Sequence, residues 1–450
     1  MLNLANYTTD LMGKTILENS FGSGNILKTI VSRYITSALS AGCDVQTISQ
    51  GLSRDVYGIE LDKQLFDECV LGLNDIASKF GLPAVKWSLF NEDALKMNLD
   101  VKFDYIVGNP PYISYKEMDS DSRKTIRERF DFCSTGKFDY CYAFIELGIN
   151  HLKNSGKLVQ LIPNNIYKNV FAQKLRDKLK EHISAIYDYP NQKLFDKALT
   201  SVSLFLYDQN NDSETIIYKN MTNDQERIIN RERLTGKWTF SDTSPQLETM
   251  IRFGDVFHAS ASVATLCNKA FLVSQKDILE EKIESDTVYK AASPKSLQYQ
   301  QEKQIIFPYR YNDEGLVHYT AEEFERLFPN AATHLKKFTN ELKDRNSDGN
   351  AAWFEYGRSQ ALAHLNTKKL LLSTVITQAV EVYKIDEKTV PFAGIYITIK
   401  DNNYSLDDAI SILKSEQFLK YVCTIGVNVS GKSLRITCKD INEYCFVGGQ

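Results

Sequence analysis

Short apolar runs alternate with helical segments along the first half of the chain, and this alternation restricts the fold more than any other feature. Runs rich in β-forming residues cover residues 14–18, 55–62, 85–90, 103–108, 156–163, 182–187 and 201–207. Between them, residues 25–39, 63–79, 138–152 and 170–180 carry apolar positions at helical spacing. Strands that alternate with helices form a mainly parallel sheet with right-handed crossovers. The sequence therefore predicts a seven-stranded, Rossmann-like α/β domain over residues 1–210.

The second half of the chain has a different pattern. A chain of 450 residues is too long for one ordinary core, so two domains are expected. The polar segment Asn210–Ser213 is typical of a linker. Beyond it the periodicity weakens, and β-type runs at residues 370–376 and 393–399 mix with short helices. We expect a second domain, of α+β type, over residues 215–450.

Composition excludes several classes of protein. No apolar run approaches the roughly 20 residues of a membrane helix, and no signal segment opens the chain, so a cytoplasmic protein is expected. The eight cysteines form no Cys-x-x-Cys pair, and the six histidines do not cluster with them, so no metal site is expected. The net charge is −4. A polyanionic partner would therefore need a local basic patch.

Three of the predicted strands end in carboxylates. Glu18 is followed by the glycine turn Phe21–Gly24, where glycines let the backbone pass close to a ligand. Glu60 ends the second strand, where an acid can accept both hydroxyls of a ribose, while Asp62 can instead cap the next helix. A helix cap is also the alternative for Glu60. Asp93 follows the third strand.

The fourth strand stops at Asn109-Pro110-Pro111-Tyr112. Prolines cannot donate to a sheet ladder, so this turn follows the carboxyl end of the strand, where open α/β sheets bind their ligands. The two prolines restrict the backbone and hold the Asn109 amide and the Pro110 carbonyl in one orientation beside an aromatic ring. Two rigid acceptors beside a ring suit a planar group that carries an NH2. The alternative is a strand-ending turn with no chemistry.

Together these motifs resemble those of a known family, the amino-group, adenine-specific DNA methyltransferases of the TaqI-like kind. The resemblance is strongest at residues 109–112 and good at Glu18 with residues 21–24, and at residues 58–60. It continues through residues 139–152, 156–158 and 162–164. Weaker matches to the family's target-recognition domain lie at residues 253–256, 268–271 and 342–345, at Trp353 and Arg358, and at residues 428–431.

The resemblance implies S-adenosyl-L-methionine as the cofactor. Its methionine amine would lie near Glu18 and the glycine turn, its ribose on Glu60, and its adenine amino group on Asp93. Phe144 matches an aromatic position near the cofactor, although a helical Phe is commonly a core residue. The residues assigned to the cofactor are Glu18, Phe21, Gly22, Gly24, Glu60, Asp93, Leu95 and Phe144.

The resemblance also implies a flipped-out target adenine in double-stranded DNA. Asn109 and Pro110 would accept hydrogens from its N6 amino group, and Tyr112 would stack on one face of the base. Phe195 matches a second stacking aromatic, or is a loop anchor. A monomer on DNA is expected, and a separately encoded restriction endonuclease is a candidate partner.

Three basic residues of the second domain are candidates for DNA contact, because Arg and Lys favour phosphates and guanine edges: Arg345, Arg358 and Lys432. Two other functions remain open. RNA adenine methyltransferases carry the same Asn-Pro-Pro-Tyr motif. A catalytically impaired DNA-binding protein is the second alternative, because the family's Thr-Pro and cofactor-covering helix are represented only by residues 6–10.

Overall fold

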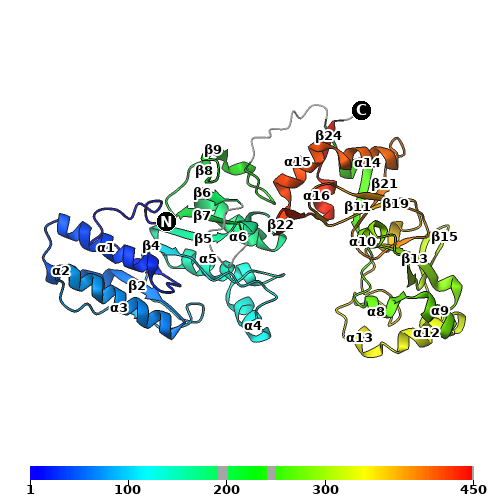
Figure 1. Cartoon of the computed structure of the whole chain (residues 1–450), viewed down its shortest axis with the longest axis horizontal. Helices are drawn as coiled ribbons and strands as arrows, with labels where there is room; N and C mark the ends of the chain where they lie inside the picture. The colour runs from blue at the N-terminus through cyan, green and yellow to red at the C-terminus, as the bar shows by residue number, and fades with distance from the viewer. Residues whose placement is uncertain (191–200, 241–249, 448–450) are drawn as a thin grey trace. The chain divides into compact units, whose positions relative to one another are not determined.

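The computed structural model describes residues 1–190, 201–240 and 250–447, and the chain divides into two compact units. Unit 1 covers Met1–Ser241 and unit 2 covers Asp242–Gln450 (Figure 1). Within the described ranges, no helix has the length and apolar character needed to cross a bilayer. The eight cysteines are all free.

Unit 1 is built on one mixed sheet with the strand order β3-β2-β1-β4-β5-β7-β6-β8-β9 (Figure 1). Its strands are β1 (Ile16–Glu18), β2 (Val56–Ile59), β3 (Ser88–Phe90), β4 (Phe103–Gly108), β5 (Leu152–Pro163), β6 (Ile183–Tyr189), β7 (Val202–Asp208), β8 (Thr215–Asn220) and β9 (Gln225–Asn230). β1 to β5 pair in parallel, and β7 runs antiparallel to β5 and β6. All seven predicted strands form, so the predicted α/β fold is confirmed.

Two apolar cores cover the two faces of this sheet. Side chains alternate along a strand, so neighbouring residues belong to different cores, as Ile106 and Val107 of β4 do. One core contains α1 (Asn25–Ser40), α2 (Val45–Asp55) and α3 (Lys63–Lys79). The other contains residues of α4 (Ser120–Arg129), α5 (Cys141–Asn150) and α6 (Gln173–His182). The helices predicted from periodicity correspond to α1, α3, α5 and α6.

The structure corrects the expected end of the first domain. The prediction ended it at residue 210, but β8 pairs in parallel with β6, and β9 pairs with β8, so both strands extend the sheet of unit 1. The division lies at Ser241. The polar segment Asn210–Ser213 is a turn inside unit 1, between β7 and β8, because a polar turn by itself does not reveal which strand the next one will pair with.

Unit 2 combines small sheets with short helices, as predicted. Its strands are β10 (Met250–Arg252), β11 (Phe257–Ala261), β12 (Leu272–Val273), β13 (Val288–Ala292), β14 (Lys303–Ile306), β15 (Tyr309–Asn312), β16 (Gly315–His318), β17 (Lys369–Leu372), β18 (Val375–Ile376), β19 (Val382–Ile385), β20 (Val390–Pro391), β21 (Ile395–Ile399), β22 (Val427–Ser430), β23 (Ser433–Arg435) and β24 (Cys445–Val447). Its sheets have the orders β11-β21-β17-β19, β12-β14-β13-β20, β18-β23-β22, β10-β24 and β15-β16.

The helices of unit 2 are all ten residues or shorter. They are α7 (Phe253–Val256), α8 (Asn268–Phe271), α9 (Gln275–Glu281), α10 (Pro294–Gln298), α11 (Ala321–Leu327), α12 (Pro329–Lys336), α13 (Thr339–Lys343), α14 (Leu406–Lys414), α15 (Glu416–Ile425) and α16 (Cys438–Asn442). Several begin with a side-chain cap, such as Ser405 on α14. Two separate apolar cores hold these elements together.

Candidate active site

The carboxyl ends of β1, β2 and β4 lie side by side at one edge of the sheet of unit 1. Glu18 pairs with Gly58 of β2 on one side and with Val107 of β4 on the other. This register brings together Glu18 at the end of β1, Glu60 directly after β2 and the Asn-Pro-Pro-Tyr turn after β4. In open α/β sheets this edge is where ligands bind.

Glu60 is held against the glycine turn. The backbone N–H of Gly22 donates to Glu60 Oε2 at 2.7 Å, and the N–H of Asp62 donates to Oε1 at 2.8 Å. Gly22 and Gly24 have φ of 55° and 78°, where residues with a side chain are strained. A Cβ on Gly24 would also lie 2.2 Å from Cys69 Sγ. Asp62 does cap α3, where it accepts from Leu65 N, so the ribose assignment stays with Glu60.

Glu18 is a buried carboxylate with an unused oxygen. It is 2% exposed, and burial, with a contribution from the nearby Glu60, raises its pKa well above the usual range. The backbone N–H of Leu27 donates to the carboxylate, while Oε2 has no partner among the described residues. An acceptor buried in this way at the start of α1 suits a ligand that brings its own hydrogen-bond donor, such as an amine.

The remaining residues assigned to the cofactor lie in different surroundings. Asp93 accepts from Leu95 N at 3.0 Å and lies 3.4 Å from the ammonium of Lys96. Leu95 is buried, and Phe144 is a buried core residue of α5 whose ring packs against Tyr140. Phe21 is buried and packs against Phe66.

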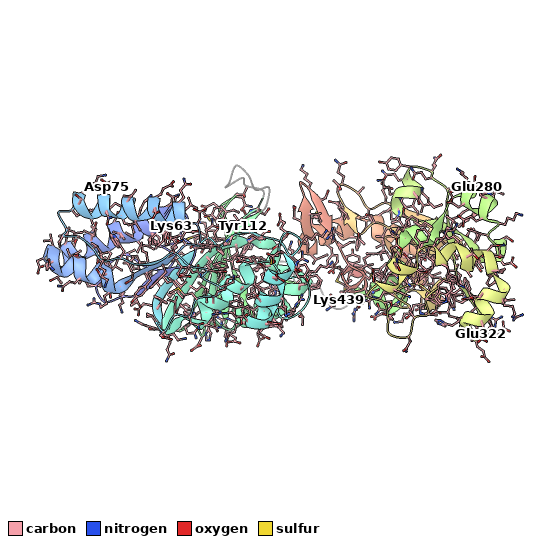
Figure 2. The ribbon with its side chains drawn as sticks, turned by 90° about the horizontal axis from the view of Figure 1, so that it is seen from below. Lys63, Asp75, Tyr112, Glu280, Glu322 and Lys439 are labelled. Atoms are coloured by element: carbon pink, nitrogen blue, oxygen red, sulfur yellow. The ribbon has the colours of Figure 1, made fainter. Side chains whose placement is uncertain are left out.

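The Asn-Pro-Pro-Tyr turn contains a hydrogen bond that the sequence did not reveal. The Tyr112 hydroxyl lies 2.7 Å from Asn109 Oδ1, to which it donates, and 3.2 Å from the carbonyl oxygen of Leu161 (Tyr112 is labelled in Figure 2). Burial raises the pKa of Tyr112, so the hydroxyl keeps its proton at neutral pH. Pro110 is buried, and Ser20 Oγ donates to the backbone oxygen of Asn109 at 3.4 Å.

Two buried amide side chains lie beside the residue that precedes Asn109. Gly108 pairs with Gln160 of β5, and a Cβ on Gly108 would lie 2.8 Å from Asn19 Oδ1 and 3.9 Å from Gln160 Nε2. Asn19 is 1% exposed and Gln160 is fully buried, and their amide atoms have no partner among the described residues. The only sequence signal for Gln160 is a polar residue inside the apolar run Leu158–Ile162.

Asp139 and Asn165, which the sequence did not single out, lie next to the Asn-Pro-Pro-Tyr turn. The backbone N–H of Tyr140 donates to the carbonyl of Ile113, which places Asp139 beside the segment that follows Tyr112. Asn165 Nδ2 lies 3.5 Å from Asp139 Oδ2. Burial raises the pKa of Asp139 to about 6 despite this contact, so the carboxyl titrates close to neutral pH.

The three basic residues proposed for DNA contact have different environments. Arg345 donates to the carbonyls of Thr265, Leu342, Glu355 and Trp353, so its guanidinium connects loops inside unit 2. Its assignment to DNA contact stays a prediction, and these four bonds give it a structural role as well. Arg358 forms an ion pair with Asp348 at 3.0 Å, and Lys432 is exposed at the turn between β22 and β23. Phe195 lies outside the described residues.

These features define a class of protein. The strand order of unit 1, with an antiparallel β7 between β5 and β6, and the edge that carries the glycine turn and the acids are those of a Rossmann-like α/β domain that binds its ligand at the carboxyl ends of its strands. S-Adenosyl-L-methionine is the expected cofactor of such a site with these motifs. The acceptor oxygen on Glu18 and the open space beside Gly22 at the turn fit such a ligand.

Comparison with known proteins refines this assignment. Residues 56–195 match the Eco57I restriction-modification methylase family. The Type II restriction enzyme and methyltransferase RM.Eco57I of Escherichia coli is 22% identical over 74% of this chain and 41% of its own length. The Type II methyltransferase M.BstVI of Geobacillus stearothermophilus is 22% identical over 97% of this chain and 85% of its own length.

A solved structure resembles most of the length of the chain. The Type IIL restriction-modification enzyme MmeI, determined in complex with DNA, covers 98% of this chain with a TM-score of 0.60 and 12% sequence identity, and the match covers 63% of that enzyme. The chain thus spans less than half of RM.Eco57I and less than two thirds of the MmeI chain. The predicted resemblance to restriction-modification methyltransferases is confirmed.

Proposed function

We propose that this protein transfers a methyl group from S-adenosylmethionine to the N6 amino group of an adenine in duplex DNA. The observation that carries the proposal is the position of the Asn109 and Pro110 acceptors, which share one sheet edge with the Glu18 and Glu60 carboxylates. The N6 amino group has two hydrogens to donate and a lone pair delocalised into the ring. An acceptor pair beside a cofactor site is what methylation of such a group requires.

Glu18, Glu60 and Asp93 would hold three successive parts of the cofactor. Oε2 of Glu18 would accept from its ammonium group, and Glu60, already fixed by Gly22 and Asp62, would accept from its ribose hydroxyls. Asp93 would accept from its adenine amino group, with Leu95 packed nearby. When bound, S-adenosylmethionine supplies a methyl group activated by a positively charged sulfur. No stronger electrophile is needed.

Asn109 and Pro110 would prepare the nitrogen that receives the methyl group. Their oxygens would draw the two N6 hydrogens out of the plane of the base, so that the nitrogen lone pair points toward the methyl carbon. The nitrogen held in this way would accept the methyl group that the cofactor supplies, and it would then release one proton to water. Positioning of the reactants would supply most of the rate enhancement, with electrostatic stabilisation of the charge on nitrogen.

The target base must leave the duplex to reach this turn, at a cost of a few kcal/mol. Tyr112 would recover part of that cost by stacking on the base, and Phe195 is proposed as the opposite wall. Unit 2 would bind the DNA around the target. The complex of MmeI with DNA supports DNA as the substrate, and the similarity to RM.Eco57I, a Type II restriction enzyme and methyltransferase, supports a restriction-modification role.

The test uses the whole protein, tritiated S-adenosylmethionine and an unmethylated plasmid. We expect tritium in the DNA, and sequencing for modified bases should find N6-methyladenine at one short site. Asn109→Ala should lower transfer by at least 100-fold while cofactor binding by calorimetry stays within threefold of wild type. Asn340→Ala, which changes an exposed asparagine of α13, is the matched control.

Two results would overturn the proposal. Transfer to transcribed RNA but not to the plasmid would establish the RNA alternative. A protein that binds duplex DNA and cofactor but transfers no methyl group to either nucleic acid would establish the catalytically impaired DNA-binding alternative.

A further inference from the structure

One small sheet of unit 2 has an inner face and an outer face. In the sheet β18-β23-β22, Ile376 pairs with Leu434, and Leu434 pairs with Asn428. Ile376 is buried and Leu434 packs on the same apolar core, so this face of the sheet lies toward the interior. Arg435, one residue further along β23, therefore points outward, and it is exposed.

The outer face of this sheet carries one arginine with apolar and hydroxyl side chains beside it. Arg435 pairs with Val375 of β18 on one side and Val427 of β22 on the other, so its stem lies between two valines. Ser433 shares its face by alternation along β23, and its Oγ lies 2.9 Å from Thr377 Oγ1. These residues make the outer face of the sheet a continuous surface without an acid.

A side-chain hydrogen bond closes the turn between β22 and β23. Asn428 Nδ2 donates to the carbonyl of Gly431 at 2.9 Å, and Gly431 has φ of 54°. This closes the strands into a tight two-stranded ribbon with exposed Lys432 in its turn. Val429 is 46% exposed on the same ribbon. We call β22, β23 and their turn the basic ribbon.

The stretches of sequence that form the basic ribbon and the neighbouring strand β18 contain no acid. The chain has 57 Asp and Glu residues in 450, yet none occurs from Tyr356 to Val380 or from Gln417 to Lys439, the two stretches that contain β18, β22 and β23. Two lysines close to the ribbon in sequence do have acid partners. Lys420 of α15 forms an ion pair with Glu416, and Lys439 of α16 forms one with Glu443 (Lys439 is labelled in Figure 2).

Lys432 and Arg435 are different from these paired lysines. Over the described ranges, neither has a carboxylate within ion-pair distance. In a protein of net charge −4, two exposed cations without an acid partner, on a sheet whose strands carry no acid, are the local basic patch that a polyanion needs.

We propose that the basic ribbon enters the major groove of the substrate DNA, with Arg435 on a guanine edge and Lys432 on a backbone phosphate. A two-stranded β-ribbon fits the width of that groove, and arginine contacts guanine O6 and N7 with two hydrogen bonds. The valines beside Arg435 and the exposed Val429 are the residue type that contacts a thymine methyl group. This inference rests on the proposed function, since it names the surface through which unit 2 would read its DNA.

The test compares three variants of the full chain with wild type. The DNA is a duplex that contains the methylation site found by sequencing, and a shuffled duplex of the same composition. Arg435→Ala should bind the site about 10-fold to 100-fold more weakly than wild type, which is the range expected for one lost guanine contact. Its affinity for the shuffled duplex should change little. Arg435→Lys should keep its affinity for the shuffled duplex and lose the preference for the site.

Lys432→Ala should instead weaken binding to both duplexes by the same factor and lower the slope of log affinity against log salt by about 1. Sequencing of DNA methylated by Arg435→Ala should show relaxed choice at one base pair. Arg326→Ala is the control, since Arg326 is an exposed arginine on α11 among Glu322, Glu323 and Glu325, and it should bind as wild type does.

The outcomes separate this inference from the proposed function. If wild type methylates DNA, but folded Arg435→Ala binds and modifies DNA like Arg326→Ala, the DNA-reading role of the basic ribbon is refuted and the proposed function stands. Equal losses of Arg435→Ala on both duplexes would overturn the guanine contact. Absence of any DNA methylation by wild type would overturn the proposed function itself, and this inference with it.

Discussion

Gly108→Ala tests whether the position of the Asn-Pro-Pro-Tyr turn depends on the space left by one missing methyl group. Gly108 ends β4, next to Asn109, and its new Cβ would lie 2.8 Å from Asn19 Oδ1. Ordinary contacts begin near 3.4 Å, so the two groups would have to separate by roughly 0.5 Å. Asn19 is buried, so its side chain has little room to move away.

The expected effects follow from this distance. Overpacking of this kind costs about 1–3 kcal/mol, while replacing glycine gains roughly 0.4–1 kcal/mol by restricting the unfolded chain. The net cost of about 0–2.6 kcal/mol would lower the melting temperature by about 10 °C at most. A displacement of about 1 Å at a reacting group costs ~100-fold in rate, so half of that should slow methyl transfer about 10-fold or more.

Single-turnover transfer of tritiated methyl from S-adenosylmethionine measures the rate, and scanning fluorimetry measures stability. The double variant Gly108→Ala/Asn19→Ala removes the clashing oxygen, so it should be faster than Gly108→Ala alone. Gly349→Ala is the control, because nothing lies within 4 Å of a Cβ at that exposed glycine. A Gly108→Ala protein whose transfer rate is within twofold of wild type would refute the reasoning.

Two further substitutions probe buried charges. In the folded protein the pKa of Asp139 is raised to about 6, so the folded state binds its proton more tightly than the unfolded state does, and stability falls as pH rises from about 4 to 6. Asp139→Asn should remove this dependence and raise the free energy of unfolding at pH 7 by up to ~3 kcal/mol, as measured by urea titration at several pH values. Arg345→Met should destabilise unit 2 by about 2–4 kcal/mol, because buried carbonyls lose their donor, and a melting transition unchanged from wild type would contradict this role.

Local sequence patterns were sufficient for the first seven strands of unit 1 and for the order of the motifs at their carboxyl ends. An apolar run, a following turn and an amphipathic helix each depend on neighbours in sequence, so β1 to β7 could be predicted one by one. The boundary at residue 210 was wrong because it depends on the pairing of β8 with β6, which no local pattern encodes. Gln160 and Asn19 were missed for the same reason, since only the register of β1, β4 and β5 places them beside Gly108.

Unit 2 shows the limit of reasoning from residue type. Arg345 and Arg435 have the same side chain, and the sequence favoured the first as a DNA contact. The structure surrounds Arg345 with carbonyl acceptors, while Arg435 stands exposed on a strand without an acid nearby. Burial and partners decide what an arginine can do, and both depend on contacts between residues that are distant in the chain, such as Arg345 with Thr265.

The hydrogen bond from Tyr112 to Asn109 gives the tyrosine of the turn a second role in the proposed reaction. An amide oxygen has two lone pairs, so the Tyr112 hydroxyl can use one and leave the other for a hydrogen of N6. The same bond fixes the orientation of the Asn109 amide, because the Tyr112 hydroxyl donates to its oxygen and would lose this acceptor if the amide turned over. A turned amide would also present its NH2 group to the base and repel the amino hydrogens of N6. Phenylalanine at position 112 would keep the stacking face but lose this orientation, which gives a physical reason for a tyrosine at the end of Asn-Pro-Pro-Tyr.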